Sequence, residues 1–362
     1  MATICRRSAT GSGSSDVNIL VLNPGSSSLK RAFYRFPAGV VISESEAIDA
    51  AGVRVVHGGA EFVRPVRVDD SVLDAIRGLS ELAPLHNPMA VRIIEETRTA
   101  LPGVPIVAVF DTAFHQTMPT LAARYALPPE VDVLAGIRRY GFHGISYSYV
   151  SSRVEASRHI VCHLGNGASV CAIDNGSSVD TSMGFTPMEG LVMGTRAGDL
   201  DPGVILYLLR HGKSEADLDE LLNHQSGMLG VSGRSGDVRE MESAARGGDA
   251  RAELALEMFA YRAAKYIGAY AAVLRGVDAL TFTAGIGEHS PSMRSRICER
   301  LGFLGVVLDE ERNRAARADE RRISCGPVDV WVIPTNEELE IARLTFKMLA
   351  RISHRPSPRD DG

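Results

Sequence analysis

The feature that most constrains the fold is a pattern that occurs twice, once in each half of the chain. The segment "NILVLNPGSSSLKRAFY" (18–34) reads as a strand, a turn of Asn, Gly and Ser, and a second strand, and "HIVCHLGNGASVCAIDNG" (159–176) has the same order. The turn glycines, Gly25 and Gly167, lie about one domain length apart. Two hairpins whose turns are rich in available N–H groups predict two related domains, each able to hold part of a polyphosphate chain.

The first turn taken alone has two interpretations. "NPGSSSLK" could hold a phosphate, or it could be an ordinary serine-rich turn. It is not a Walker A loop, because no second glycine precedes Lys30. A third glycine turn, "TFTAGIGEH" (281–289), follows another strand and has the small residues that pack flat against a base or ribose. The three segments together favour the two-domain ATP clamp of the actin, sugar-kinase and chaperone-ATPase superfamily.

The rest of the chain alternates strand-like and helix-like runs, which indicates an α/β protein. Helices are expected over 249–275, where apolar residues recur at helical spacing, and over about 336–350. Further strands are expected at 53–56, 105–110, 169–173, 279–284 and 328–333, besides those at 18–22 and 159–164.

The composition is that of an ordinary globular protein. The 362 residues are 45% hydrophobic and 23% charged, and the net charge of −5 offers no positive field for nucleic acid or anionic lipid. No apolar run is long enough to span a membrane, and residues 1–16 contain no signal-peptide h-region. We expect a cytoplasmic protein with disordered tails at 1–16 and 354–362 and with free thiols at Cys5, Cys162, Cys171, Cys298 and Cys325.

Nine segments occur in an order that resembles the acetate kinase family over roughly residues 17–350. The longest, at 180–203, is close to diagnostic of that family. The segments are "NPGSSSLK", "RVVHGG" (54–59), "APLHNP" (83–88), "FDTAFHQTMP" (110–119), "YGFHG" (140–144), "HLGNGAS" (163–169), "DTSMGFTPMEGLVMGTRAGDLDPG", "AGIGE" (284–288) and "TNEELEIAR" (335–343).

The resemblance implies an α/β protein of two related domains of the actin-like ATPase, or ribonuclease-H-like, type that close on a nucleotide cleft. The first domain is expected over 17–115 with 340–353, and the second over 116–339. The implied activity is reversible, direct in-line transfer of the γ-phosphoryl group of ATP to the carboxylate of acetate, giving acetyl phosphate and ADP. Mg²⁺ is the implied cofactor, with Mn²⁺ as an alternative, and a homodimer is the implied assembly.

The residue types fit that chemistry. A carboxylate is already ionised at neutral pH, so it needs no general base. The protein must instead cancel negative charge where one anion approaches another, and the planar fork of arginine suits this task. Taken singly, Arg54 and Arg196 could be solvated surface charges, His143 a structural histidine, Asp111 a helix or turn cap, and Glu337 an acid at a helix start.

The resemblance assigns roles to particular positions. The catalytic residues would be Asp111, Arg54, His143 and Arg196, and the metal ligands Asn23 and Glu337. Acetate would be bound by Arg54, Val56, Leu85, Phe142 and Pro187, of which the apolar ones would singly read as core. The nucleotide would be bound by Ser26, Ser28, Lys30, His163, Asn166, Gly167, Asp237, Arg239, Gly285, Ile286, Gly287 and Glu288.

Some positions depart from the family pattern. Tyr147 stands where a histidine is usual, His289 replaces an asparagine, Ala197 replaces a common cysteine, and Pro24 lies in the first turn. The first domain is shortened between 35 and 53, where family members carry several dozen more residues, so we expect part of its sheet to be uncovered. Propionate kinase and a nucleotide-binding pseudoenzyme are the alternatives, and a chaperone-type ATPase is disfavoured because no residues are left over for a peptide-binding part.

Overall fold

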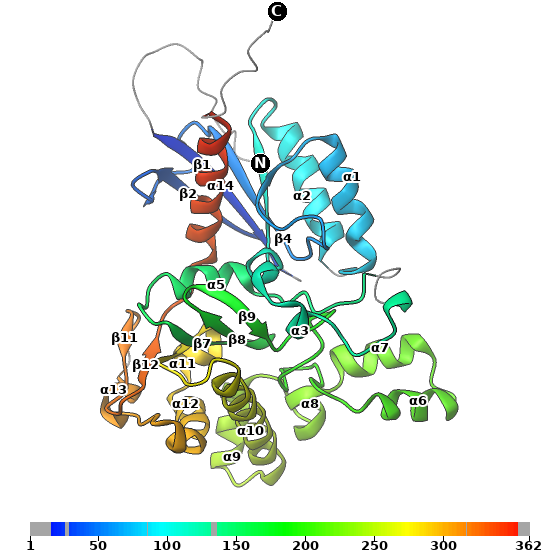
Figure 1. Ribbon diagram of the computed structural model, residues 1–362, viewed down its shortest axis with the longest axis vertical. Helices are drawn as coiled ribbons and strands as arrows, with labels where there is room; N and C mark the ends of the chain where they lie inside the picture. The colour runs from blue at the N-terminus through cyan, green and yellow to red at the C-terminus, as the bar shows by residue number, and fades with distance from the viewer. Residues whose placement is uncertain (1–15, 26–28, 85, 132–135, 316, 354–362) are drawn as a thin grey trace, which may run out of the picture. The chain divides into compact units, whose positions relative to one another are not determined.

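The chain forms two compact units in the computed structural model (Figure 1), which describes residues 16–25, 29–84, 86–131, 136–315 and 317–353. Unit 1 comprises the residues up to Phe114 together with those from Asn336, and unit 2 comprises His115–Thr335. Each unit contains a six-stranded sheet. No helix among the described residues is long and apolar enough to cross a membrane.

Unit 1 has a mixed sheet in the order β3-β2-β1-β4-β6-β5. Strand β1 pairs antiparallel with β2 and parallel with β4, and β4 pairs parallel with β6. Its elements are β1 Val17–Pro24, β2 Leu29–Phe36, β3 Val40–Val41, β4 Ala50–Val55, β5 Val66–Arg67, β6 Ile106–Phe110, α1 Asp70–Gly78, η1 Leu79–Glu81, α2 Asn87–Ala100 and α14 Glu337–Ser353.

Helices cover both faces of this sheet. Alternate residues of a strand point to opposite faces. Ala51, Val53 and Val55 of β4 join the apolar core that contains residues of α1 and α2, whereas Gly52 approaches Thr345 of α14. The expectation of an uncovered sheet is therefore wrong for β1, β4 and β6, and apolar exposure in this sheet is greatest at the short edge strand β3.

Unit 2 repeats the arrangement in the order β11-β12-β10-β7-β8-β9, with β7 antiparallel to β8 and parallel to β10. Its strands are β7 Arg158–Leu164, β8 Ala168–Asp174, β9 Ser177–Thr181, β10 Ala279–Thr283, β11 Arg321–Arg322 and β12 Asp329–Val332. Its helices are α3 Thr120–Ala123, α5 Gly144–Ser151, α6 Pro202–Arg210, α7 Glu215–His224, α8 Gly227–Ser232, α9 Val238–Arg246, α10 Ala250–Val273, α11 Ala284–His289, α12 Pro291–Cys298 and α13 Glu310–Arg314, with η2 Ala113–Thr117 joining the units and η3 Glu299–Leu304 after α12.

The repeated sequence pattern thus corresponds to a repeated topology. In each unit, the first strand of a hairpin lies between its antiparallel partner and a parallel strand from later in the chain. Strands β1 and β7 are buried almost throughout, as expected for strands that helices or other strands cover on both faces. The long helix α10 buries the stripe containing Leu256, Phe259 and Ala263 and leaves Leu254, Met258 and Tyr261 exposed.

Candidate active site

Unit 1 brings Arg54 and Asp111 together at one edge of its sheet. Arg54 lies near the end of β4, and Asp111 follows β6, the parallel neighbour of β4. The Arg54 Nε and Nη2 atoms donate to Asp111 Oδ2 at 3.0 and 2.5 Å. Arg54 Nη1 donates to Asn23 Oδ1, at the end of β1, at 3.3 Å. Polar side chains at the carboxyl ends of neighbouring parallel strands meet at the edge of the sheet where α/β proteins bind ligands.

The charge of Arg54 is held by carboxylates around it. Burial, the largest influence, acts to lower its pKa, but the carboxylates of Asp111, Glu337 and Glu338 together raise the pKa of Arg54 above its ordinary value. Asp111 is fully buried. The pair therefore presents an oriented, permanently charged guanidinium.

The start of α14 adds two carboxylates to this cluster. Asn23 Nδ2 donates to Glu337 Oε2 at 3.1 Å and to Glu338 Oε1 at 2.9 Å, and Lys30 Nζ lies 3.8 Å from Glu338 Oε1. Glu337 is the first residue of α14, where the helix dipole favours an acid, and its part in a metal site stays a prediction. Sequence reasoning missed Glu338, although it stands beside Glu337 in "TNEE".

These side chains suit a hard cation. Carboxylate and amide oxygens are the ligands that Mg²⁺ prefers, and Mg²⁺ takes only one or two protein carboxylates because it keeps water and substrate phosphates. Among the described residues, no group of three or more His, Cys, Asp or Glu side chains could hold a metal ion. Asn23, Glu337 and Glu338 are oxygen donors of the kind that a hard divalent cation takes when it also keeps water or substrate oxygens.

Unit 2 places the loop that carries Arg196 against the second glycine turn. Gly194 N donates to Asn166 O at 3.0 Å. A Cβ atom at Gly194 would lie 2.0 Å from Asn166 Oδ1, so a larger residue there would displace the Asn166 side chain. The "GTRAGD" segment and the "HLGNGAS" turn, which are separate in sequence, are consequently neighbours in the fold.

Arg196 and His143 converge beside Gly167. A Cβ atom at Gly167 would lie 3.4 Å from Arg196 Nη1 and 3.7 Å from His143 Nε2. Arg196 Nη1 donates to Pro187 O at 3.1 Å, and no carboxylate of the described chain pairs with it. Burial lowers the pKa of Arg196, which shows that its surroundings do not offset the loss of water. A partly buried cation of this kind suits an anionic ligand.

His143 has an unfavourable backbone conformation, and its ring contacts neighbouring side chains. Its φ of 59° is left-handed, at the N-cap of α5, and non-glycine residues in that region cost energy that functional sites often bear. The ring stacks on His163, with centroids 4.0 Å apart, and Nδ1 lies 2.8 Å from Ser169 Oγ.

We call Asn23, Arg54, Asp111, Glu337 and Glu338 the unit 1 cluster, and His143, Gly167, Ser169 and Arg196 the unit 2 cluster.

The segments predicted to surround the adenosine also lie in unit 2. Asp237 caps α9 by accepting from Arg239 N at 2.8 Å, and it pairs with the exposed Arg239 side chain. The expected glycine turn at 281–289 is wrong: "AGIGEH" forms the short helix α11 directly after β10, with Ala284 at a left-handed φ of 63°. Glu288 in α11 accepts from Thr335 N at 3.0 Å.

The predicted acetate pocket is divided between the units. Val56 is buried in unit 1, whereas the buried Phe142 and the half-buried Pro187 belong to unit 2. Ser26, Ser28 and Leu85 lie outside the described residues.

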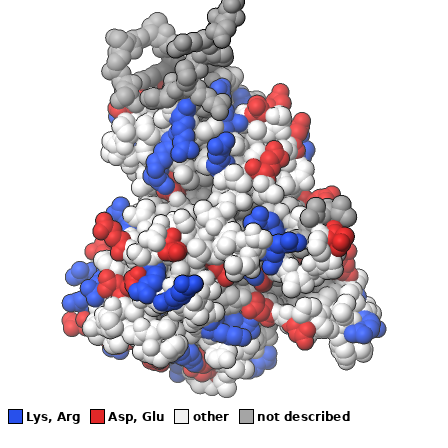
Figure 2. Space-filling model, in the orientation of Figure 1, with Lys and Arg blue, Asp and Glu red and all other residues white. Residues whose placement is uncertain are grey.

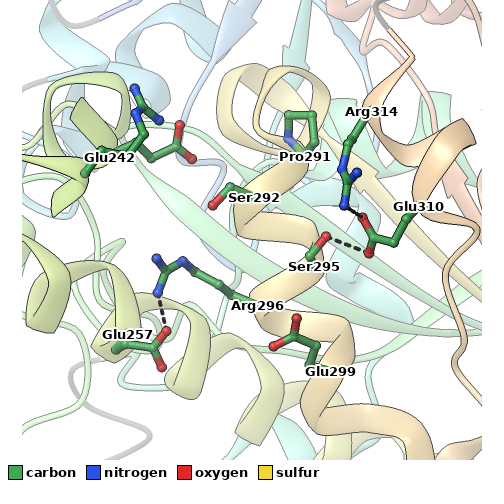
Figure 3. Close-up of a pocket in the computed structure, with 10 residues that line it drawn as sticks. Glu242, Glu257, Pro291, Ser292, Ser295, Arg296, Glu299, Glu310 and Arg314 are labelled. Carbon is green, nitrogen blue, oxygen red and sulfur yellow. Dashed lines mark hydrogen bonds and ion pairs between the residues drawn. The ribbon is translucent and has the colours of Figure 1, made fainter.

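One cavity in unit 2, of about 610 Å³, lies away from all these positions (Figure 3). It is bounded by α9, α10, α12 and α13, and no predicted site residue lines it. Some of its charges are already paired: Arg296 of α12 with Glu257 of α10, and Arg314 with Glu310 within α13. Ser290, beside the cavity, donates to Glu242, which lines it. Nothing in this lining selects a ligand.

Comparison with known proteins gives one consistent family. The model of the acetokinase family matches residues 36–343. The chain is 54% identical to the acetate kinase of Heliobacterium modesticaldum over 320 residues, which are 86% of this chain and 80% of that protein. It is 51% identical to the acetate kinase of Thermotoga maritima over 325 residues, 86% of this chain and 81% of that protein.

Solved structures agree. The crystal structure of Porphyromonas gingivalis acetate kinase has 40% sequence identity and a TM-score of 0.86, covering 92% of this chain and all of that one. A propionate kinase from Francisella tularensis has 38% identity and a TM-score of 0.84 with the same coverage. The predicted fold class, an α/β protein of the actin-like ATPase type, is confirmed.

Proposed function

We propose, since the chain belongs to the acetokinase family, that it transfers the γ-phosphoryl group of ATP to the carboxylate of acetate and catalyses the reverse reaction. The observation that carries this proposal is the Arg196 guanidinium beside Gly167 and His143, which no described carboxylate neutralises. Such a cation is available to an entering anion. We also propose that units 1 and 2 are the two actin-like ATPase domains expected from the sequence.

In unit 1, we assign Arg54 to the acetate carboxylate. Asp111 holds its Nε and Nη2 atoms, so the guanidinium is fixed in rotation before substrate binds. A pre-oriented cation loses little freedom on binding, and the entering carboxylate is already ionised, so no residue has to remove a proton from it.

In unit 2, we assign Arg196 and His143 to the transferring phosphoryl group. Its negative charge spreads over three oxygens in the transition state, and donors that are already in place stabilise it without reorganisation. Asn166 and Gly167 in the turn, with Asp237, Arg239 and residues Gly285–Glu288, are assigned to ATP or ADP. Lys30 of unit 1 is assigned to the same nucleotide.

We assign the divalent ion, Mg²⁺ with Mn²⁺ as an alternative, to Asn23 and Glu337, with Glu338 as a third oxygen donor. When bound, the ion would screen the negative charge of the phosphates. The protein side chains hold its position: Asn23 contacts both glutamates and Arg54.

Acetate is the proposed acceptor and propionate the second candidate, because a propionate kinase is among the similar structures. Val56, Phe142 and Pro187 are proposed to contact the methyl group, where one added methylene changes binding by about 1–3 kcal/mol. A pseudoenzyme is disfavoured because Asn23, Arg54 and Asp111 are bonded to one another in unit 1.

We propose that the chain acts as a homodimer in the cytoplasm. Helix α6 is apolar, yet none of its residues is buried; Val204, Leu206, Tyr207 and Leu209 are all exposed. Figure 1 shows α6 and α7 extending from the rest of unit 2. A contiguous apolar surface of this kind marks an interaction site.

On the face shown in Figure 2, basic and acidic side chains are interspersed. The free thiols Cys162, Cys171 and Cys298 suit a reducing compartment.

Sedimentation tests the dimer. Leu206→Lys with Tyr207→Lys should yield monomers, because burying two unpaired lysines in an interface is costly. Leu121→Lys, at an exposed leucine of α3, is the matched control and should leave the dimer intact. Dimers of the double variant would exclude α6 from the interface.

The activity is tested by trapping acyl phosphate with hydroxylamine. Acetate, Mg²⁺ and ATP with the purified chain should give acetyl hydroxamate and ADP in equal amounts. Propionate should react with a lower kcat/KM if acetate is the preferred acceptor, and a higher value would favour the propionate kinase assignment. Absence of hydroxamate with both acids, from folded protein that binds ATP, would support the pseudoenzyme.

A further inference from the structure

A chain of buried hydroxyl groups leads from Tyr147 to His143. Tyr147 Oη lies 2.5 Å from Ser169 Oγ, and Ser169 Oγ lies 2.8 Å from His143 Nδ1. Tyr147 and Ser169 are fully buried. Tyr147 is one of the positions where this chain departs from the pattern of its family, which usually has histidine there.

The direction of these hydrogen bonds follows from the number of protons. Burial, with the nearby thiols of Cys171 and Cys162, raises the pKa of Tyr147 well above 10, so the phenol keeps its proton. Since Tyr147 Oη lies within hydrogen-bond distance of Ser169 Oγ and keeps its proton, the phenol O–H can donate to Ser169. Ser169 has a single proton, and with its oxygen accepting from Tyr147, that proton is directed to His143 Nδ1.

Whether Nδ1 of His143 accepts this hydrogen bond determines whether Nε2 carries the ring proton. In a neutral imidazole one nitrogen carries the proton and the other does not. If Nδ1 accepts from Ser169, the proton is on Nε2, the atom that lies beside Gly167 together with Arg196. An N–H at that point attracts an anionic oxygen, whereas a bare nitrogen lone pair would repel it.

We propose that Tyr147 is a positioning residue for the phosphotransfer activity proposed above: acting through Ser169, it keeps His143 in the form that carries its proton on Nε2. The stacking of His143 on His163 and its left-handed backbone fix the plane of the ring. The hydroxyl chain then fixes the proton. Among the described residues of unit 2, the charged and titratable groups near the ring include Arg196 and His163, with Tyr147 beyond Ser169.

Nitrogen NMR on the full chain labelled with ¹⁵N-histidine tests the proposal independently of activity. A nitrogen without a proton resonates far downfield of one with a proton, and the His143 signals are identified by their loss in His143→Ala. We expect Nε2–H in the unchanged chain at pH 8. In Tyr147→Phe, Ser169 is free to accept from Nδ1–H, and the other tautomer should gain population. Tyr140→Phe is the matched control, since this buried tyrosine donates to the Gly136 carbonyl.

Kinetics supply the second measurement. Removing a whole donor at such a site costs about 10²–10³ in kcat, so partial loss of the correct tautomer should lower kcat by about three- to tenfold in Tyr147→Phe, with KM for acetate and ATP nearly unchanged. The deficit should grow as pH rises, because the imidazolium form carries Nε2–H regardless of Ser169. Ser169→Ala should have a similar effect, and the double variant should lose no more than either alone.

Tyr147→His, which restores the usual residue and an N–H donor, should keep the tautomer and most of kcat. The proposal is overturned if folded Tyr147→Phe, checked by its melting transition, keeps the nitrogen shifts and kcat of the unchanged chain. If Tyr147→Phe does not fold, Ser169→Ala provides the same test, and unchanged nitrogen shifts and kcat in that variant would likewise overturn the proposal. An unchanged chain that transfers no phosphoryl group would refute the proposed function and leave the NMR measurement valid.

Discussion

At the scale of single residues, the two arginines differ in what balances their charge. Arg54 is paired with Asp111 and surrounded by carboxylates, whereas Arg196 donates to a carbonyl and lies beside a methionine sulfur. The first is oriented by its partner, and the second is available to an anion. Replacing either arginine should abolish most of the activity, and the reason should differ between the two.

Arg196→Ala should lower kcat/KM by about 10³-fold or more, because an arginine on a transferring phosphoryl group contributes about 10³–10⁵ in rate. The fold should persist, since no carboxylate is left without a partner. Arg54→Ala should also remove most activity, but it leaves the buried Asp111 without its guanidinium, so its unfolding midpoint should fall as well. Steady-state kinetics and thermal melting separate the two effects. A loss of tenfold or less in Arg196→Ala would rule out its assigned role.

Val56→Ala should widen the proposed acetate pocket and move the preference toward propionate and butyrate. A methylene in such a pocket changes discrimination by about 1–3 kcal/mol, or roughly 5- to 150-fold in the ratio of kcat/KM values. Competition between acetate and propionate measures that ratio directly. Val53→Ala, a buried change within β4, the strand that ends just before Val56, is the control. An unchanged ratio would mean that Val56 is a core residue only.

At the scale of elements, the shortened connection between β2 and β4 is fastened to β1. Asn18 Nδ2 donates to Ala47 O at 2.9 Å, and Asn18 Oδ1 accepts from Arg35 Nε at 3.0 Å. Arg35 also pairs with Glu46, and Asp49 accepts from Asn18 N. Polar contacts thus hold a connection that contains no helix.

Asn18→Ala should destabilise unit 1 by about 1–3 kcal/mol, because it leaves the partly buried Ala47 carbonyl without this donor. Denaturant unfolding measures the change. Asn223→Ala, which removes only a surface contact with Asp219, should alter stability by about 0.5 kcal/mol or less. KM for acetate should not change in Asn18→Ala, since Asn18 and Asn23 lie at opposite ends of β1. Equal stabilities for the two variants would show that the connection needs no anchor.

At the scale of the whole molecule, buried neutral histidines make stability depend on pH. Burial lowers the pKa of His115 and of His159 to about 4 from 6.5, and Arg139 adds to the effect at His115. The folded chain therefore binds fewer protons than the unfolded chain between those values. Stability from these groups is complete above pH 6.5 and is lost as the pH falls toward 4.

The expected loss is roughly 3 kcal/mol for each histidine, from the shift and the cost of one pKa unit. Urea unfolding at pH 7, 5.5 and 4.5 should show the decline. His159→Gln should lower stability at pH 7 but flatten the decline by about half. A variant with the same slope as the unchanged chain would mean that His159 contributes nothing to acid unfolding.

The strands and the two long helices were predictable because their apolar periodicity is local. The predicted helix at 249–275 and strand at 159–164 match α10 and β7 within a few residues. The turn predicted at 281–289 was wrong, because a run of small residues does not reveal that a helix starts directly at the strand end. Which stripe of α10 faces the core also depended on packing partners elsewhere in the chain.

The sequence by itself determined the repeated hairpin, the α/β class and the residue types that chemistry requires, because these depend on local periodicity and on motifs short enough to read along the chain. Only the tertiary structure decided that Asp111 holds Arg54, that Glu338 joins Asn23, and that Tyr147 reaches His143 through Ser169. Each of these contacts joins residues on different strands or helices. Hydrogen bonds act over about 3 Å, so they depend on how those elements pack and not on distance along the sequence.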